Sequence, residues 1–140
     1  MAIYVETTVG EKRCLAAALQ VKRLFDLSPD EASEGVVEFG EEVYPLVDLH
    51  REFGVPQPEH RGCMLVSFEG HRYGLVFSSF LRVVELGDHE FMPLPVRSER
   101  LETFFDAVHG NSSGGFFFRL ALSNIHRLVD DEETEELAAV

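Results

Sequence analysis

Tryptophan is absent from this 140-residue chain, cysteine occurs only twice, and basic residues number 12 against 25 acidic ones. Cys14 and Cys63 lie far apart and fit no paired metal-ligand spacing, so we expect two reduced, buried thiols. The net charge of −13 repels phosphate backbones. This imbalance argues against nucleic acid or an anionic membrane as a partner.

Long apolar runs are also missing. No segment approaches the roughly 18 apolar residues of a membrane span. The start Met-Ala-Ile-Tyr-Val-Glu lacks the basic region that opens a signal peptide. We therefore expect a cytoplasmic protein without direct membrane insertion. At the other end, six acids in the seven residues 130–136 predict a solvated, mobile tail over residues 130–140, whose deletion should leave folding and binding nearly unchanged.

Motifs of catalysis and cofactor binding are scarce. Ser78-Ser79 and Ser112-Ser113 show no G-x-S-x-G elbow and no evident partner base. Gly114-Gly115 leads into an expected strand, whereas a phosphate-binding glycine loop opens a helix. The histidines are isolated, each in an expected turn, connector or exposed position: His50, His60, His71, His89, His109 and His126. We expect no enzyme activity, no metal and no cofactor.

What the chain does contain is short strands. Nine or ten runs of β-type residues, separated by turn signals every 8–12 residues, indicate an all-β barrel or sandwich with two or three helical pieces. The clearest hairpin is 63–68 with 73–77, and the strongest single strand is 116–122. A helical turn is expected at 20–25, and a polar loop from 28 to 34.

Residues 35–54 form the most informative segment. Two apolar runs, Val36–Phe39 and Val43–Val47, flank the polar corner Gly40-Glu41-Glu42. Asp48 can then cap a short helix, and Gly54 can end it. The segment predicts a strand, a tight corner, a second strand and a capped helical turn.

The two halves of the chain share a layout of hairpin, further strand and capped helical turn. We therefore expect one domain over residues 1–129 with two lobes, roughly 1–54 and 62–129, which exchange strands in one version of this hypothesis. Residues 101–108 are ambiguous between helix and strand. Ser123 or Asn124 is expected to cap a last helical turn that ends near Val129.

Apolar side chains also occur where strands meet turns, at Val21, Phe39, Met64 and Phe80. A small barrel packs only alternate residues inward, so some of these should face out and bind a partner. The alternative is that they fill a phenylalanine-rich core, and periodicity does not separate the two. An interaction module is the class of protein that these residues favour.

The segment from Gly35 through Pro45 to Asp48 resembles the CheW family of chemosensory coupling proteins. The family pattern is roughly G-V-[IV]-N-L-R-G-x-[VI]-[VI]-P-[VI]-[VI]-D-L-R, and it fits here without a gap. The likeness continues in the hairpin around Gly70 and Gly74, and in Phe118-Arg119-Leu120-Ala121-Leu122 near the end.

This resemblance implies two intertwined five-stranded SH3-like barrels joined by a hydrophobic seam, without catalysis or cofactor. It also implies partners: the cytoplasmic tip of a chemoreceptor (a methyl-accepting chemotaxis protein) and the regulatory domain of a CheA-type histidine kinase. The residues that it places at partner surfaces, together with the apolar corner residues, are Val21, Arg23, Val36, Phe39, Gly40, Glu41, Met64 and Phe80. We expect Phe39→Asp or Phe80→Asp to weaken partner binding and leave the fold intact.

The chain departs from the family pattern at charged positions. Gly40 replaces an arginine, Arg23 stands where a glutamate is usual, and Ser78 replaces an aspartate. Each lost charge-assisted contact is worth roughly 1.5–3 kcal/mol when desolvated. Two versions of the function remain open: an adaptor between receptor and kinase, or an accessory protein that binds receptors or another CheW-like protein but not the kinase. A small-ligand or enzymatic barrel is a third hypothesis.

Overall fold

The computed structural model describes residues 1–110 and 115–129, and within them the chain is mostly β-strand. The elements follow in the order β1 (Ala2–Val9), β2 (Lys12–Ala17), η1 (Ala18–Gln20), β3 (Val21–Leu27), α1 (Pro29–Glu34), β4 (Val36–Phe39), β5 (Glu42–Asp48), α2 (Leu49–Phe53), β6 (Arg61–Phe68), β7 (His71–Phe77), β8 (Ser79–Leu86), η2 (Asp88–Glu90), β9 (Phe91–Met92), α3 (Glu99–Phe104), β10 (Phe105–Gly110) and β11 (Phe116–Leu120). Residues 122–129 form a further helix. The predicted acidic tail lies outside the described residues.

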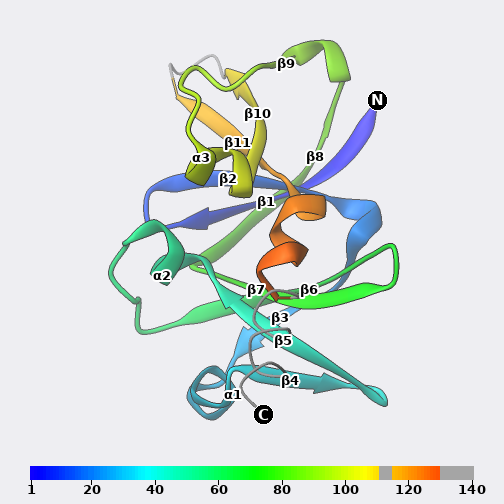
Figure 1. Ribbon diagram of the computed structural model, residues 1–140, viewed down its shortest axis with the longest axis vertical. Coiled ribbons are helices and arrows are strands. Elements are labelled where there is room, and N and C mark those ends of the chain that lie inside the picture. The colour runs from blue at the N-terminus through cyan, green and yellow to red at the C-terminus, as the bar shows by residue number, and fades with distance from the viewer. Residues whose placement is uncertain (111–114, 130–140) are drawn as a thin grey trace.

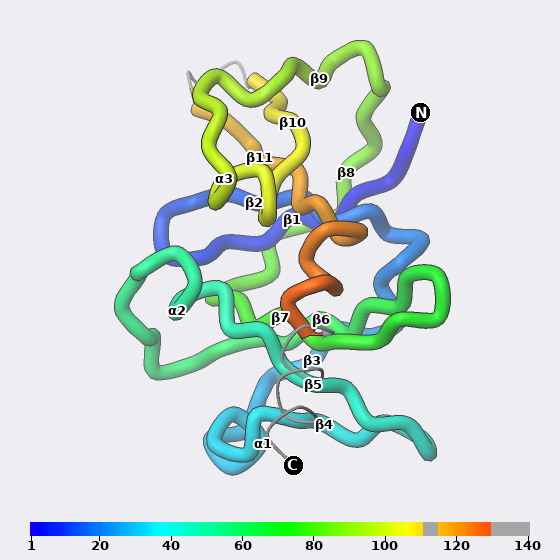
Figure 2. The backbone as a smooth tube through the Cα atoms, in the orientation of Figure 1, coloured from blue at the N-terminus to red at the C-terminus, as the bar shows by residue number. Residues whose placement is uncertain are grey.

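The strands form two sheets, which lie one above the other in Figure 1. The six-stranded sheet has the order β8-β1-β2-β11-β10-β9, and the five-stranded sheet has the order β3-β6-β7-β5-β4. The chain begins in the first sheet, builds the whole second sheet from β3 to β7, and returns through β8 (Figure 2). The all-β fold class is therefore confirmed.

The two sheets do not coincide with the predicted lobes. Residues 1–54 and 62–129 each supply strands to both sheets, because β1 and β2 pair with β8 and β11 while β3 pairs with β6. Two parallel pairings, β2 with β11 and β5 with β7, hold together segments that are far apart in sequence. One sheet has six strands rather than five because the two-residue β9 extends it beside β10.

The five-stranded sheet curls until its two edge strands meet. β3 and β4 stand at opposite ends of the strand order, yet the Arg23 guanidinium carbon lies 4.9 Å from the centre of the Phe39 ring. In the six-stranded sheet, a ring contact of 5.3 Å between Tyr4 on β1 and Phe91 on β9 spans strands that are not neighbours in the order. Both sheets are therefore curled in the manner of small barrels.

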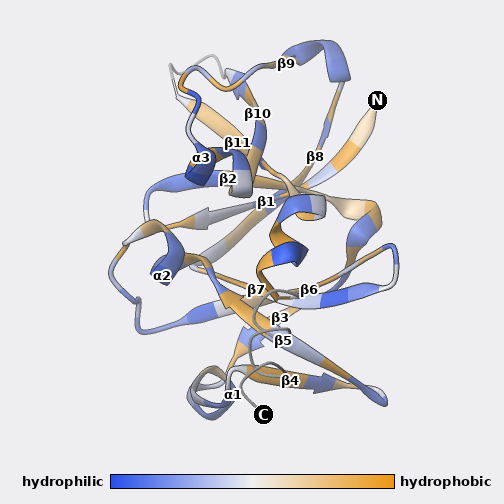
Figure 3. Ribbon diagram, viewed as in Figure 1, coloured by the Kyte–Doolittle hydropathy of each residue, from blue (hydrophilic) through white to orange (hydrophobic). Residues whose placement is uncertain are grey.

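A shared core fills the seam between the two sheets. It contains side chains from both sheets, among them Cys14 and Ala16 of β2 and Met64 and Val66 of β6. Alternate residues of the same strands face separate cores inside the barrels: Leu15 on β2, and Cys63 and Leu65 on β6. These strands are buried on both faces, which explains their nearly continuous apolar sequence. In Figure 3 hydrophobic colour marks β5 and β7 near the place where the two halves meet, and it also marks β4 at the lower end.

The helix at residues 122–129 closes one side of the seam. Its buried residues Leu122, Ile125 and Val129 belong to the shared core, and the hydroxyl of buried Tyr73 on β7 donates a 2.8 Å hydrogen bond to the Leu122 carbonyl. The helix begins at Leu122, at least two residues earlier than expected, so neither Ser123 nor Asn124 caps it. The Ala121 carbonyl instead accepts the first bonds, from the amides of residues 124 and 125.

Local predictions succeeded where capping and turn residues were explicit. Asp48 accepts a 3.0 Å bond from the His50 amide at the start of α2, and Gly54 ends the helix with a φ of 68°. The polar loop expected at 28–34 is wrong, because Ser28 and Glu31 form a capping box that begins α1. The helical turn expected at 20–25 is also wrong: β3 runs through it, because Val21–Leu27 pairs with β6.

Candidate functional site

Six residues at the far end of the five-stranded sheet make up what we call the corner surface: Arg23, Val36, Phe39, Gly40, Glu41 and Val43. The register of the β4–β5 hairpin places Phe39 on one face of the hairpin, with Val37, and places Val36 and Val43 on the opposite face. Five of these are predicted partner-binding residues, and the structure brings them to one corner from β3, β4 and the β4–β5 turn. Val36, Phe39 and Val43 remain 38%, 39% and 50% exposed.

A tight hairpin presents this surface. β4 pairs with β5 so that Val36 faces Pro45 and Phe39 faces Glu42. Gly40 in the connecting turn has a φ of +65°, a conformation that an L side chain adopts only with strain. The arginine that the family pattern has at this position would carry that strain, so the replacement by Gly40 fits the turn that this chain makes.

Arg23 reaches the corner because β3 is bulged. The pairing of β3 with β6 shifts register between Val21 and Arg23, and such a bulge re-aims the neighbouring side chain. Its guanidinium carbon lies 4.9 Å from the centre of the Phe39 ring and 5.9 Å from that of Phe25. Within residues 1–110 and 115–129, no carboxylate forms an ion pair with Arg23. A partner carboxylate could therefore bind this arginine without displacing an internal one.

Two predicted partner residues of the β3–β6 pair do not lie on the corner surface. Met64 is fully buried in the shared core, because β6 is a central strand with sheet neighbours on both sides. The prediction that Met64 faces outward at a strand end is therefore wrong. Val21 is half-buried against the same core opposite Val66, so only part of its side chain is accessible.

Phe80 lies apart from the corner surface, at the start of β8. It is 47% exposed, and it lines an open hollow of about 610 Å³ together with Leu24, Phe25 and Phe77. Phe25 also lines a smaller hollow of about 160 Å³ at the corner surface, so the two depressions adjoin along β3.

The sequence analysis missed three exposed apolar residues, Val43, Leu81 and Val83, whose side chains are at least 45% exposed. Their apolar runs look like buried strands, and only the edge position of β8 and the hairpin geometry expose them.

A buried acid in the six-stranded sheet was also missed. Glu6 on β1 is fully buried, and its two carboxylate oxygens accept from Arg13 Nη2 at 2.7 Å and from Arg82 Nε at 3.0 Å. Burial alone would raise the pKa of Glu6, but the hydrogen bonds and charges of the two arginines outweigh it and lower that pKa below 4.5. Glu6 therefore joins β1, β2 and β8 as an ionised carboxylate.

The structure also brings together three residues that the sequence analysis left separate. His50 is fully buried, with Nδ1 2.9 Å from Asp48 Oδ1 and Nε2 2.7 Å from the hydroxyl oxygen of Ser78. Ser78 lies 28 residues further along the chain, in the connection between β7 and β8. No motif in the sequence could have revealed this partner, because parallel pairing of β5 with β7 creates the contact.

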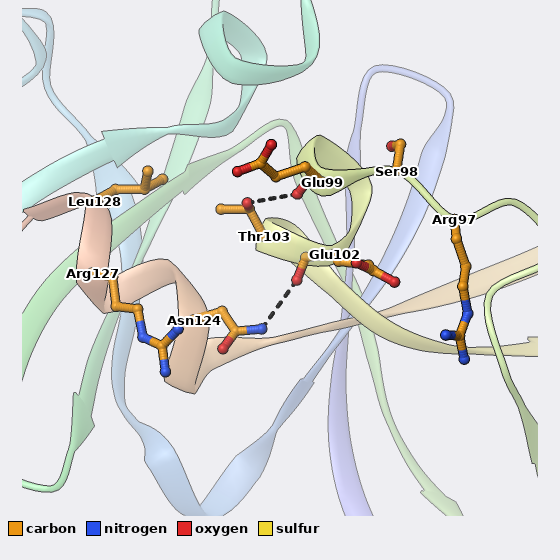
Figure 4. A pocket seen from close by; sticks show the side chains of 8 residues that line it. All are labelled: Arg97, Ser98, Glu99, Glu102, Thr103, Asn124, Arg127 and Leu128. Atoms are coloured by element: carbon orange, nitrogen blue, oxygen red, sulfur yellow. Dashed lines mark hydrogen bonds between the residues drawn. The ribbon is translucent and has the colours of Figure 1, made fainter.

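A third hollow, of about 770 Å³, lies between α3 and the helix at residues 122–129 (Figure 4). Asn124 donates a 3.0 Å bond to the Glu102 carbonyl across it, and Thr103 bonds the Glu99 carbonyl within α3. Arg97 and Arg127 also line this hollow, but none of the predicted partner residues does.

The structure shows free, buried cysteines, as expected. Burial raises the pKa of each thiol to about 12, so both stay protonated. Among the described residues, no group of three or more histidine, cysteine or acidic side chains is arranged to hold a metal ion. None of the described helices has the length and apolar character needed to cross a bilayer.

The two curled sheets, their shared seam and the exposed corner define an all-β protein of the SH3-like two-barrel class. The model of the CheW-like domain family matches residues 4–130, nearly the whole chain. The chain therefore belongs to the CheW-like domain family, and the suspected resemblance is confirmed.

A solved structure supports the same fold. The crystal structure of the scaffolding protein TtCheW from Thermoanaerobacter tengcongensis matches with a TM-score of 0.71 and 16% sequence identity, over 85% of this chain and 88% of that one. A search of curated proteins finds no match.

Proposed function

We propose that this chain is a non-catalytic adaptor of chemosensory signalling, which couples chemoreceptors to a CheA-type histidine kinase. The family match over residues 4–130 supports the adaptor class, and the name of the TtCheW scaffolding protein agrees with it. The corner surface is the observation that carries the proposal. It combines the exposed ring of Phe39 with Arg23, which forms no ion pair with a carboxylate of the described residues.

Protein partners bind most strongly through aromatic and arginine side chains near the centre of an interface. Arg23 and Phe39 supply such a pair, and their contact at 4.9 Å holds the guanidinium in place before a partner arrives. The expected partner groove or strand would cover Phe39 and offer an acid to Arg23.

A second candidate function is an accessory protein that binds receptors or another CheW-like protein, but not the kinase. The observation that favours it is the turn at Gly40-Glu41. The family pattern has arginine and glycine there, whereas this chain presents a glycine and an acid. A partner surface that is complementary to an arginine would meet Glu41 instead, and opposed like charges weaken binding.

Titration of the purified chain against two separate probes distinguishes the two functions. One probe is the regulatory domain of a CheA-type kinase, and the other is the cytoplasmic tip of a chemoreceptor. Kinase binding with a Kd of about 1 µM or tighter supports the adaptor and contradicts the accessory function. Binding of the receptor tip alone supports the accessory function, and binding of neither probe contradicts both.

A further inference from the structure

The five-stranded barrel has two free strand edges that face each other. β3 and β4 stand at opposite ends of the strand order, so neither has a ladder partner on its outer side among the described strands. Residues of both strands line the hollow of about 160 Å³ at the corner surface, which we call the corner hollow. A free strand edge is a place where another chain can add a strand.

The register of the hairpin shows which backbone groups of β4 are free. The Leu46 amide donates a 2.9 Å bond to the Gly35 carbonyl. Because bonded and non-bonded residue pairs alternate along an antiparallel ladder, every second residue after Gly35 directs its backbone groups toward β5. Val36 and Glu38 therefore direct their N–H and C=O groups away from β5. Pro45, which has no N–H, stands opposite Val36 and agrees with this assignment.

The corner hollow has apolar walls and room for one side chain. Phe25 of β3 and Phe39 of β4 line it, together with the buried side chains of Val37 and Leu65. Its volume lies below the roughly 300–1,000 Å³ of sites for small molecules and cofactors. Side chains of an added strand would alternate between two faces, so one on the face of Val37 and Phe39 would enter the hollow.

The charges on the two edges have opposite signs. The guanidinium carbon of Arg23 lies 4.9 Å from the centre of the Phe39 ring, at the turn end of β4. Neither Arg23 nor Glu38 forms an ion pair within the described residues. A segment with an acid near Arg23 and a base beside Glu38 therefore matches both edges.

We propose that the protein partner of the corner surface binds through an extended segment that adds to the free edge of β4. Its backbone would accept hydrogen bonds from the Val36 and Glu38 N–H groups and donate to their carbonyls. One aliphatic side chain would fill the corner hollow, and an acid would pair with Arg23. Strand addition supplies affinity through the main chain and specificity through alternate side chains. The inference rests on the proposed function, because it describes how the partner of that surface is held.

A partner that only packs against Phe39 and Arg23 would leave the backbone of β4 in water. The two binding modes differ at the Glu38 amide. Glu38→Pro removes the outward N–H, and an edge strand tolerates proline where that group faces solvent. Glu38→Ala removes the same carboxylate and keeps the N–H, so it is the matched control.

The experiment titrates wild type, Glu38→Pro and Glu38→Ala against the regulatory domain of a CheA-type kinase and against a chemoreceptor tip. For the probe that wild type binds, we expect Glu38→Pro to bind at least about tenfold more weakly than Glu38→Ala. Far-UV spectra and urea unfolding check that both variants fold. Equal affinities of the two folded variants would overturn strand addition and leave the proposed function standing. Failure of wild type to bind either probe would contradict both.

Amide hydrogen exchange of the wild-type chain is a second test, which needs no substitution. With the probe bound, the Val36 and Glu38 amides should exchange at least about tenfold more slowly. The Val43 amide stands opposite Glu38 in a non-bonded pair and points to the other side of the hairpin, so its rate should not change. Unchanged rates at Val36 and Glu38 in the complex would overturn strand addition.

A second copy of this chain is the alternative occupant of the edge. The net charge of −13 opposes that pairing. Sedimentation of the chain alone over a range of concentrations tests it, and we expect a monomer. Self-association that Glu38→Pro abolishes and Glu38→Ala preserves would assign the β4 edge to a second copy and overturn its assignment to a different protein.

Discussion

Arg13 and Arg23 both stack on aromatic rings, one in each sheet, but they differ in whether a carboxylate of the chain forms an ion pair with them. Arg13 in the six-stranded sheet lies 4.2 Å from the centre of the Phe117 ring and forms a 2.7 Å ion pair with buried Glu6. Arg23 in the five-stranded sheet lies 4.9 Å from the Phe39 ring, and no described carboxylate pairs with it. The first arginine therefore serves the fold, whereas the second is available to a partner.

This difference follows from strand position. Glu6 is on β1, which lies between β2 and β8, so its carboxylate is reached by arginines from both neighbours. Arg23 is on an edge strand, where one side has no ladder partner and the side chain reaches across the barrel opening. An edge position exposes groups that a central strand buries.

The largest expected effect is on the free energy of unfolding, and it comes from Glu6→Ala. It leaves Arg13 and Arg82 without their carboxylate, although both can be partly solvated because they are 34% and 57% exposed. We expect a loss of about 3 kcal/mol in the free energy of unfolding, measured with urea. Arg23→Ala is the matched control and should change that free energy by less than about 0.5 kcal/mol. Equal losses in the two variants would contradict the comparison.

Acid should erase the contribution of Glu6. The pKa of Glu6 is lowered from 4.5 in the folded chain, so the unfolded chain binds the proton more readily. The stabilisation is therefore complete at pH values above 4.5 and is lost as the pH falls through the folded pKa. Urea unfolding of wild type and Glu6→Gln from pH 7 downward should show a stability difference that shrinks in acid. A constant difference would mean that Glu6 contributes no ionised carboxylate.

Phe39→Asp tests the other side of the comparison. Phe39 is 39% exposed, and an aspartate there would place a charge in the proposed contact and beside Arg23. We expect binding of the kinase domain or receptor tip to weaken by at least about tenfold, with an unchanged far-UV spectrum. Leu19→Asp changes an apolar side chain that is 89% exposed on η1, and it should bind as wild type. Unfolding of Phe39→Asp would show that this ring is part of the core.

The same contrast explains what the sequence could predict. Asp48, Gly54 and the hairpin of β6 and β7 were recognised because capping, turns and strand patterns depend on nearby residues. The division into sheets could not be read this way, since it depends on the pairing of β1 with β8 and of β2 with β11. Such contacts join residues that are far apart and have no local pattern.

The residues of the candidate site show the same contrast between local patterns and contacts of residues far apart in sequence. Val36, Phe39 and Gly40 were found through the corner motif, and Arg23 through a departure from the family pattern. The prediction that Met64 binds a partner was wrong, because an apolar strand end and a strand buried on both faces have the same sequence pattern. The partners of Glu6 and His50 come from distant strands and connections, so only the structure identifies them.

The smallest effects are expected from arginine-to-lysine substitutions, which distinguish the contribution of ring stacking from that of the positive charge. Arg→Lys keeps the positive charge but removes the flat guanidinium that covers a ring. At Arg13 this change removes a fork that donates through Nε and Nη2 to Glu6, so the free energy of unfolding should fall by about 1 kcal/mol. At Arg23 the free energy of unfolding should stay within about 0.5 kcal/mol of wild type, because no described ion pair depends on it.

Partner binding should show the reverse order, with a larger loss for Arg23→Lys than for Arg13→Lys. Arg23→Lys keeps the charge but loses the planar guanidinium that can bind a partner carboxylate through two parallel hydrogen bonds, so partner affinity should fall about two- to fivefold. Arg13→Lys should bind as wild type, because Arg13 is occupied by Glu6 and Phe117. Urea unfolding and titration of both variants against the same probe measure the four values. If Arg13→Lys weakened binding more than Arg23→Lys, the partner would contact the six-stranded sheet, and the corner surface would not be its site.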